Sequence, residues 1–306
     1  MGRRLIHEHL SEDHQAFYRR LPVLLLGSVD GYGRPFASML VNRPGFVTSP
    51  DPRTLSINGG FLAGDPVRGL RAVGSPVGVL GMNFVTRERI RLAGRITRTE
   101  GDLTILAVDQ AFGNCPQYIQ SRAPEVLTEK LSPTVAGAVD PRVLRSLDKV
   151  AAELITGTDT FFIATCHPDR GTKPSHGADI SHRGGKPGFV RVDDEYTLTW
   201  PDFRGNSFFN TLGNLALNPM VALLFPNFEE GSLLMLRGEA HIVWDAPELR
   251  WFAGAERLIR FRIHDGRFTR RAMPIRWHFL DYSPSLRHTD SWADAGAKVA
   301  KQPVLE

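Results

Sequence analysis

The chain has 306 residues, of which 42% are hydrophobic and 23% are charged, and its net charge is +4. This composition is ordinary for folded proteins and excludes a disordered chain, while the length predicts two domains. The apolar runs are too short to span a bilayer, and the N-terminus lacks the apolar stretch of an export signal. Two cysteines without a CxxC pair or a nearby His cluster predict neither a disulfide framework nor a zinc site. We therefore expect a cytoplasmic protein with no membrane partner.

In the first half, Ser11-Glu12-Asp13 predicts the start of a helix that continues to Leu21. Short apolar runs between turn residues then predict strands, with one short helix before the last two of them. The expected strands cover residues 23–28, 35–41, 45–48, 54–58, 77–82 and 88–96, and the helix lies within 65–73.

In the second half, Asp140-Pro141 predicts a helix start, because apolar residues at helical spacing follow as far as Ile155. The apolar runs 161–164 and 221–225 predict strands, and a helix is expected within 207–217. Downstream we expect a helix over 247–260, a strand over 275–282 and a loosely ordered tail over 290–306. The boundary near residue 140 predicts domains 1–140 and 141–306.

An internal repeat links the two halves. Pro44-Gly45-Phe46-Val47 recurs 143 residues later as Pro187-Gly188-Phe189-Val190, and Thr54-Leu55 and Pro76-Val77 match Thr197-Leu198 and Pro219-Met220 at the same offset. Leu92 and Gly94 match Leu236 and Gly238 at an offset of 144, so one extra residue lies between Met220 and Leu236. This self-similarity predicts a duplicated unit, and the strand spacing predicts a mainly β fold, a small antiparallel barrel with short helices in each copy.

Three strings in the second copy carry a family resemblance: residues 181–190 (SHRGGKPGFV), 199–214 (TWPDFRGNSFFNTLGN) and the Asn218-Pro219 pair. Over about residues 158–245 the chain resembles the predicted flavin-nucleotide-binding proteins related to pyridoxamine 5′-phosphate oxidase. The first copy resembles the same family more loosely over about 15–122, including segment 112–120. The resemblance implies two tandem FMN-binding split β-barrels that form an intrachain pseudo-dimer, with flavin in the groove between them.

The residues of the second copy also suit a flavin site on chemical grounds. Arg204 offers a bidentate fork to phosphate, Gly205 permits close backbone approach, and the following helix N-terminus favours an anion. The competing interpretation is a polar turn with a helix cap and a core Trp200. The predicted cofactor-binding residues are His182, Arg183, Thr199, Trp200, Pro201, Arg204, Gly205, Asn206, Ser207, Asn210, Thr211 and Asn214, joined from the first copy by Arg87, Arg89 and Gln117.

The first copy lacks the phosphate donors. At the 143-residue offset, Arg204, Asn206 and Asn210 correspond to Phe61, Ala63 and Val67, which predicts one flavin per chain. The first copy has instead Arg87, Arg89 and Arg91 in alternation, which places them on one face of a strand. That face is either directed to the flavin or an anionic substrate, or it is a solvated outer face.

The predicted function is an FMN-dependent oxidoreductase acting on a small molecule, with no catalytic residue assigned. A non-catalytic flavin carrier or redox sensor needs the same pocket and remains an alternative, as does an FAD-, deazaflavin- or haem-binding protein. The arginine-rich stretch 250–276 is interpreted as a solvated helix face, so nucleic acid is not favoured as a partner. The duplication permits a homodimer without requiring one.

Overall fold

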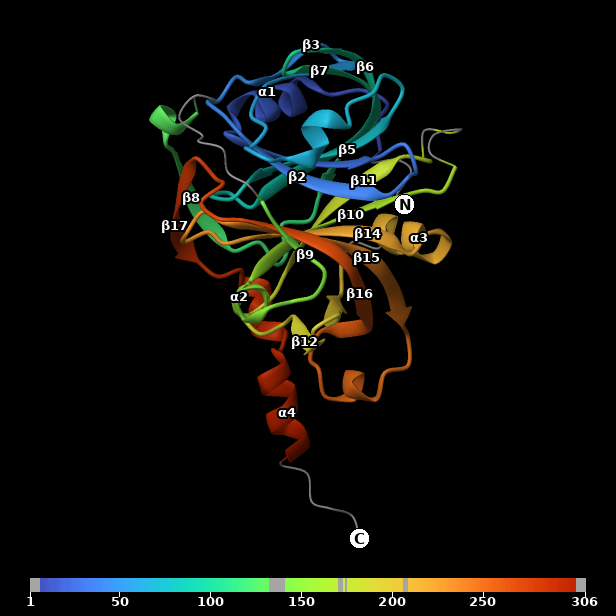
Figure 1. Ribbon diagram of the computed structural model, residues 1–306, viewed down its shortest axis with the longest axis vertical. Helices are drawn as coiled ribbons and strands as arrows, with labels where there is room; N and C mark the ends of the chain where they lie inside the picture. Colours follow the sequence, from blue (N-terminus) through green and yellow to red (C-terminus); the bar gives the residue numbers. More distant parts are fainter. Residues whose placement is uncertain (1–5, 132–140, 170–172, 174, 206–208, 301–306) are drawn as a thin grey trace.

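The structure is a computed structural model that describes residues 6–131, 141–169, 173, 175–205 and 209–300. The fold is mainly β, with antiparallel sheets and a few short helices (Figure 1). Among the described residues, no helix combines the length and the apolar character needed to cross a membrane.

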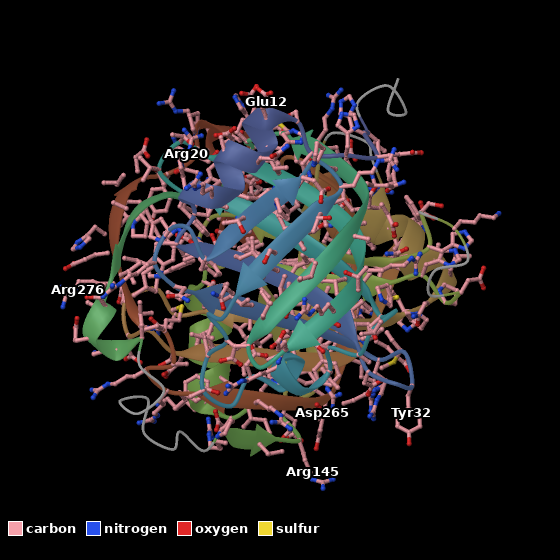
Figure 2. All side chains as sticks on the ribbon, turned by 90° about the horizontal axis from the view of Figure 1, so that it is seen from above. Glu12, Arg20, Tyr32, Arg145, Asp265 and Arg276 are labelled. Atoms are coloured by element: carbon pink, nitrogen blue, oxygen red, sulfur yellow. The ribbon has the colours of Figure 1, made fainter. Side chains whose placement is uncertain are left out.

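The first half forms a seven-stranded sheet with the order β2-β1-β5-β6-β7-β4-β3. Helix α1 (Glu12–Arg20) precedes it, with Ser11 as N-cap, and the acidic first turn and basic last turn complement the helix dipole. Glu12 and Arg20 both lie at the outer surface (Figure 2). The strands are β1 (Val23–Val29), β2 (Pro35–Val41), β3 (Val47–Asp51), β4 (Thr54–Asn58), β5 (Pro76–Asn83), β6 (Glu88–Glu100) and β7 (Leu103–Asn114), with the 3₁₀ helix η2 (Pro66–Gly69) before β5.

The second half forms a sheet with the order β11-β10-β14-β15-β16-β13-β12, and β9 pairs with β16 outside this path. If β10 is matched to β1 and the following strands in turn, the two orders are identical. The elements are β9 (Arg142–Leu144), α2 (Lys149–Gly157), β10 (Thr160–Cys166), β11 (Ala178–Gly184), β12 (Arg191–Asp194), β13 (Thr197–Phe203), α3 (Asn210–Leu217), β14 (Met220–Pro226), β15 (Leu233–Val243), the 3₁₀ helix η4 (Pro247–Arg250) and β16 (Ala255–Thr269).

A third, two-stranded sheet connects the halves, because β8 (Ser121–Val126) follows the first sheet and pairs with β17 (Ile275–Asp281) from the end of the second. The 3₁₀ helices η3 (Thr128–Lys130) and η5 (Pro284–His288) flank these strands in the chain. The last element, α4 (Trp292–Ala300), extends away from the sheets (Figure 1).

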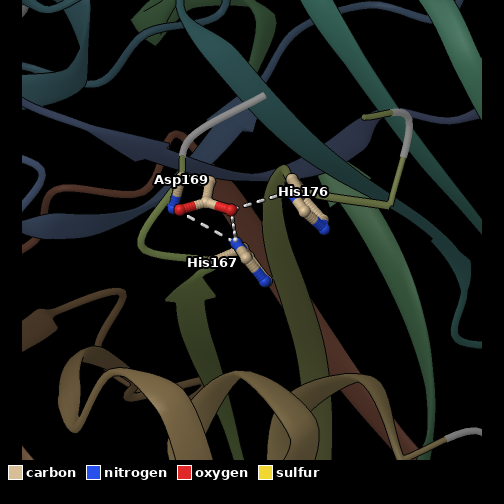
Figure 3. Close-up of side chains that lie close together, drawn as sticks. All are labelled: His167, Asp169 and His176. Carbon is tan, nitrogen blue, oxygen red and sulfur yellow. Dashed lines mark hydrogen bonds and ion pairs between the residues drawn. The ribbon is translucent and has the colours of Figure 1, made fainter. Parts of the chain in front are cut away.

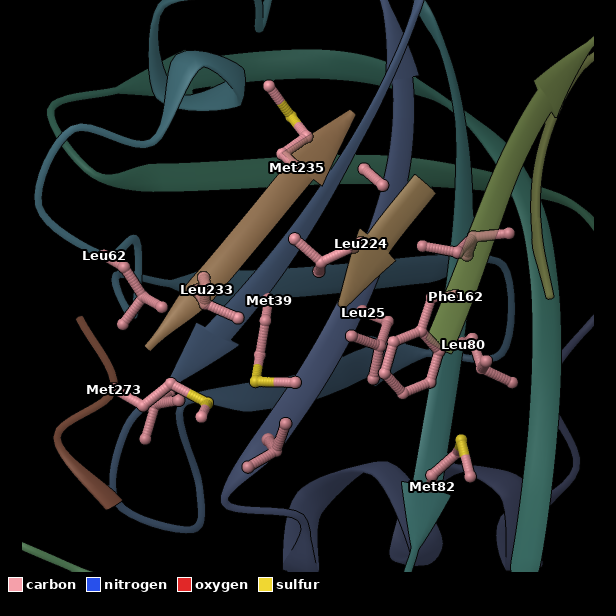
Figure 4. Packing of buried hydrophobic residues seen from close by; sticks show 14 of the residues in the cluster. Leu25, Met39, Leu62, Leu80, Met82, Phe162, Leu224, Leu233, Met235 and Met273 are labelled. Atoms are coloured by element: carbon pink, nitrogen blue, oxygen red, sulfur yellow. The ribbon is translucent and has the colours of Figure 1, made fainter. Parts of the chain in front are cut away.

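The two large sheets pack against each other in a reciprocal way. Strand β1 lies against β10, β11 lies against β1 and β5, and correspondingly β2 lies against β10 and β14. The shared core contains Leu25, Met39 and Leu80 from the first sheet and Phe162 and Leu224 from the second (Figure 4). Each sheet also encloses a core of its own. Strands β1, β2 and β10 are therefore buried along their whole length, which explains their continuous apolar runs.

Three sequence predictions about elements were wrong. The helix expected from Asp140 begins only at Lys149, after the Asp148 cap, and the preceding residues form β9. The helix expected over 247–260 is a 3₁₀ turn followed by the long strand β16, in which Arg260 and Arg262 are exposed and Phe261 between them is buried. The described part of the predicted tail forms helix α4 instead of a loosely ordered segment, and residues 301–306 lie outside the described residues.

The strand pairing also locates the extra residue of the second half. Val77 pairs with Gly94, and Val221 pairs with Gly238, so the offset of 144 already applies at β14. Pro76 pairs with Arg95 and Met220 with Glu239 in the same register, so the extra residue precedes Met220, and the interval predicted from the sequence, between Met220 and Leu236, was wrong. With this register, Leu233 and Met235 are the counterparts of Arg89 and Arg91.

Candidate functional site

A cleft of about 130 Å³ lies between the two large sheets. The first half contributes Arg89 and Arg91 from β6 and residues just after β7. The second half contributes β11, the end of β13, the start of α3 and the start of β16. The polar and aromatic lining residues are Arg89, Arg91, Asn114, Cys115, Gln117, Tyr118, Ser181, His182, Arg183, Phe189, Asp202, Phe203, Phe209, Asn210, Thr211, Glu256 and Arg257.

Positive charge is concentrated in this cleft. Burial lowers the pKa of Arg89 to about 10, and repulsion from Arg183 adds to the effect. Burial, followed by repulsion from Arg89 and Arg183, lowers the pKa of Arg91 to about 9. All of these guanidinium groups still carry a full charge at neutral pH. The mutual repulsion means that the folded protein holds them together at a cost, which an anionic ligand would offset.

Carboxylates balance only part of this charge. Arg91 forms an ion pair with Asp179, while Arg183 and Arg257 approach the two oxygens of Asp202 at 3.7 and 3.8 Å. Burial raises the pKa of Asp202 despite these two arginines. Arg89 has no carboxylate partner among the described residues. The cleft is therefore cationic, with Arg89 as its uncompensated charge.

His182 adds a hydrogen-bond donor. Burial, with help from Arg89, Arg183 and Arg122, holds the pKa of His182 well below its usual value, so the imidazole is neutral at pH 7. Its Nδ1 lies 3.4 Å from Nη1 of Arg89, which can only donate, and this places the imidazole proton on Nε2. Within the described chain, neither Nε2 of His182 nor Nε of Arg89 has a hydrogen-bond partner. These two buried N–H groups at the cleft are therefore unsatisfied hydrogen-bond donors among the described residues.

Hydroxyl groups fix the floor of the cleft beside α3. Thr211 Oγ1 donates to Ser181 Oγ at 3.0 Å, and Ser181 Oγ donates to Asp179 Oδ2 at 3.2 Å. This chain ties the first turn of α3 to β11 and to the carboxylate that pairs with Arg91. The arrangement positions the helix N-terminus, with Asn210, at the cleft.

Backbone strain and close contacts are also found at the cleft. Tyr118 and Phe209 have φ angles of +64° and +51°, which side-chain-bearing residues rarely adopt. Tyr118 Oη donates to the Arg204 carbonyl at 2.9 Å, so it crosses from the first half to the second. At Gly184 an added Cβ would lie 2.0 Å from the Tyr118 carbonyl oxygen. Only glycine lets the two segments approach this closely.

The structure brings together eight of the fifteen predicted site residues and leaves others apart. His182, Arg183, Pro201, Gly205, Asn210, Thr211, Arg89 and Gln117 line the cleft. Asn206 and Ser207 lie outside the described residues.

The remaining five lie elsewhere, outside the lining. Trp200 is fully buried in the core of the second sheet, and Thr199 bonds Asp193. Asn214 donates to Thr165, and the Arg204 side chain is exposed. Arg87 lies in the turn before β6 and binds the Ile119 carbonyl and Asp281.

Several cleft residues were missed by the sequence analysis. Arg257 and Glu256 were hidden because their segment was assigned to a helix, and Asp202 was treated as part of a polar turn. Arg91 was recognised in the alternating pattern with Arg89 but was not included in the predicted site. Cys115 follows β7 and carries no signal beyond the resemblance of segment 112–120. Tyr118, in the same segment, could be expected from the sequence either to close over the cofactor or to pack at a helix end, and it lines the cleft.

A second, smaller pocket of about 40 Å³ occupies the corresponding place on the other side of the shared core. Leu80 of the first cleft faces Arg91 across β5 and β6, and Leu224 of the second pocket faces Met235 across β14 and β15. The second pocket thus has Met235, as well as Leu233, where the first cleft has arginines. This pocket is smaller, and its lining is largely apolar.

The cleft and the paired sheets define a mainly β protein with a cationic cleft between its halves. Residues 147–275 match the family model for pyridoxamine 5′-phosphate oxidase. The resemblance seen in the sequence is thereby confirmed: the second half of the chain is related to the pyridoxamine 5′-phosphate oxidase family.

The comparison with solved structures found several chains that match part of this one. A putative pyridoxamine 5′-phosphate oxidase from Lactobacillus delbrueckii is 15% identical, with a TM-score of 0.31, over 40% of this chain and 93% of that one. HupZ from Group A Streptococcus is 11% identical, with a TM-score of 0.31, over 41% and 95%. The FAD binding protein from Mycobacterium smegmatis is 18% identical, with a TM-score of 0.28, over 42% and 99%. No curated protein matches the chain.

Proposed function

We propose that the chain is a flavoprotein that binds one FMN in the cationic cleft and acts as an oxidoreductase on a small molecule. The observation that carries this proposal is the pair of buried donors Arg89 Nε and His182 Nε2 in the cleft. Within the part of the chain that the structure describes, neither donor has a partner and Arg89 has no carboxylate. The family match of residues 147–275 supports a flavin as the ligand.

The residues present fit FMN. A phosphate dianion requires cationic and N–H donors, and the flavin ring presents carbonyl oxygens and ring nitrogens as acceptors. Arg89, Arg183 and the Nε2–H of His182 would supply donors, while Phe203 and Phe209 offer apolar surface. When bound, FMN supplies hydride or electron transfer. The chain's own residues bind and orient it, and the neutral His182 holds its proton at Nε2.

We further propose that the two halves are tandem split barrels forming an intrachain pseudo-dimer, with residues 1–140 and 141–306 as its units. The identical strand orders and the reciprocal packing of β11 on β5 and β2 on β14 support this reading. The apolar counterparts of Arg89 and Arg91 support a single flavin site in each chain.

The test is a visible absorbance spectrum of the purified protein, followed by titration of the ligand-free chain with FMN, FAD and riboflavin. We expect about one FMN per chain and clearly weaker binding of riboflavin, which lacks the phosphate. A colourless chain that takes up no flavin contradicts the proposal, and a Soret band in its place would indicate haem. Reoxidation of the reduced bound flavin by small-molecule acceptors, compared with oxygen alone, separates an oxidoreductase from a carrier.

A further inference from the structure

The connection between β10 and β11 differs from its counterpart in the first half. In the first half a short turn joins β1 to β2, and Asp30 closes it by pairing with Arg34 at 2.7 Å and accepting the Tyr32 backbone N–H. Tyr32 extends from this turn into solvent (Figure 2). The connection in the second half is longer and carries His167, Asp169 and His176 close together (Figure 3).

The three side chains are held at the base of this connection. His167 directly follows β10, and its backbone N–H donates to the Gly177 carbonyl at 3.1 Å. The two imidazole rings are stacked, with centroids 3.7 Å apart and planes at 9°. The histidine side chains are only 15% and 16% exposed, whereas Asp169 is 56% exposed. The imidazoles are therefore largely shielded, and the carboxylate remains accessible.

We propose that His167, Asp169 and His176 bind a divalent transition-metal ion such as Zn²⁺. Asp169 Oδ2 lies 3.3 Å from Nδ1 of His176 and 4.0 Å from Nδ1 of His167. Ligands at about 2.1 Å from a tetrahedral zinc ion are about 3.4 Å apart, which is close to these two distances. Two imidazoles and one carboxylate are also the ligand types that such ions prefer.

Binding requires a small rearrangement. An ion cannot lie in both of two parallel ring planes, so the rings turn about their Cβ–Cγ bonds until both Nδ1 lone pairs converge. His167 Nδ1 also gives up the hydrogen bond that it accepts from the Asp169 backbone N–H at 3.1 Å. Three protein ligands leave a fourth position open for water or a small ligand. The sequence analysis missed this site because the two histidines are nine positions apart and form no recognised metal-binding spacing.

The chain contains a matched control cluster. Glu239, His241 and His264 have similar ligand types, with Nε2 atoms 3.9 and 3.8 Å from the carboxylate. However, the two imidazoles approach different oxygens of Glu239, and the side chains are 65%, 43% and 40% exposed for His241, His264 and Glu239. This cluster does not converge on one point, so we expect no strong metal binding there.

The experiment uses the full, untagged chain after chelator treatment. Zn²⁺ binding is measured by calorimetry, Co²⁺ binding by its visible spectrum, and flavin content is recorded for the same samples. We expect the wild-type chain to bind one ion. The affinity for this ion should fall about tenfold or more in H176A and in D169N, and it should be unchanged in H241A/H264A. The flavin content should be unchanged in each variant, so a failure here is distinguishable from a failure of the flavin proposal.

Three results would overturn the metal site: no ion bound by the wild-type chain, binding unaffected by H176A and D169N, or binding equally reduced in H241A/H264A. Because D169N alters an exposed side chain, it should keep the fold even if H176A unfolds, and melting without metal checks this.

Discussion

The substitution Arg89→Leu replaces a cleft arginine with leucine, the residue found at the corresponding position of the second half, Leu233. Of the four arginines that line the cleft, Arg89 is the one for which no carboxylate partner is found among the described residues, and the change removes it. A hydrogen bond to a charged group contributes about 1.5–3 kcal/mol. We therefore expect the Kd for FMN to rise roughly 10- to 150-fold. The assay is fluorescence titration of the ligand-free chain with FMN.

In the same Arg89→Leu variant, we expect the ligand-free protein to lose no stability, although its affinity for FMN falls. Burial and Arg183 lower the pKa of Arg89, which means that the folded state disfavours its charged form. Removing that charge should leave the melting temperature at pH 7 unchanged or higher, although FMN binds less tightly. Arg267→Leu is the control, because Arg267 lines the smaller pocket in the second half. Equal FMN affinity in wild type and R89L, or an equal loss in R267L, would refute the reasoning.

Gly184→Ala should abolish FMN binding and lower the melting temperature, because the new Cβ would meet the Tyr118 carbonyl at 2.0 Å; retained binding in a titration would show that the segments can separate. Trp200→Phe should cost roughly 1–3 kcal/mol in chemical denaturation and leave the Kd for FMN unchanged, since Trp200 is a core residue; a weaker Kd would place it at the flavin. Burial raises the pKa of Asp65 from 3.8 to about 6, so the folded state loses stability relative to the unfolded state as pH rises between these values. Asp65→Asn does not titrate and should gain stability over wild type from pH 4 to pH 7, and a difference that is constant in thermal melts would contradict this.

Much of the strand arrangement was predictable from the sequence, because most strands of the shared core are short apolar runs bounded by turn residues. The failure over 247–260 has a physical cause. Leu258, Ile259, Phe261 and Ile263 fit both an apolar helix face and the inner side of a strand, and Gly254, with a φ of +77°, separates the short 3₁₀ turn from the strand. Pairing with β13 along one edge and with β15 along the other stabilises the strand over the helix.

Helix α4 had a local signal that the sequence analysis overlooked. Ser291 and Asp294 form a reciprocal cap, in which Ser291 Oγ accepts the Asp294 N–H at 3.2 Å and Asp294 accepts the Ser291 N–H at 2.9 Å. Such a Ser-x-x-acidic pattern predicts a helix start. The position at the end of the chain had been taken as a sign of disorder.

For the site, the sequence supplied the residue types but not their directions. Trp200 and Pro201 are neighbours on β13, so their side chains point to opposite faces. Pro201 lines the cleft, and Trp200 therefore lies in the core. Arg87 was placed on a strand with Arg89, but it adopts a φ of +61° in the preceding turn and binds Asp281. Turn geometry of this kind is not visible in an alternating pattern.

The difference between the two pockets follows from two strand positions. Leu233 and Met235 line the smaller pocket and pack into the shared core. Their apolar side chains therefore narrow this pocket and also hold the two sheets together. At the matching positions Arg89 and Arg91 cannot join that core without a polar partner, and they keep the other side open to an anion. A second flavin site would therefore require more than new donors, because Leu233→Arg would remove a core contact and bury a charge at the interface of the two sheets. That cost explains in physical terms why the two halves would retain the same strand order but only one cationic cleft.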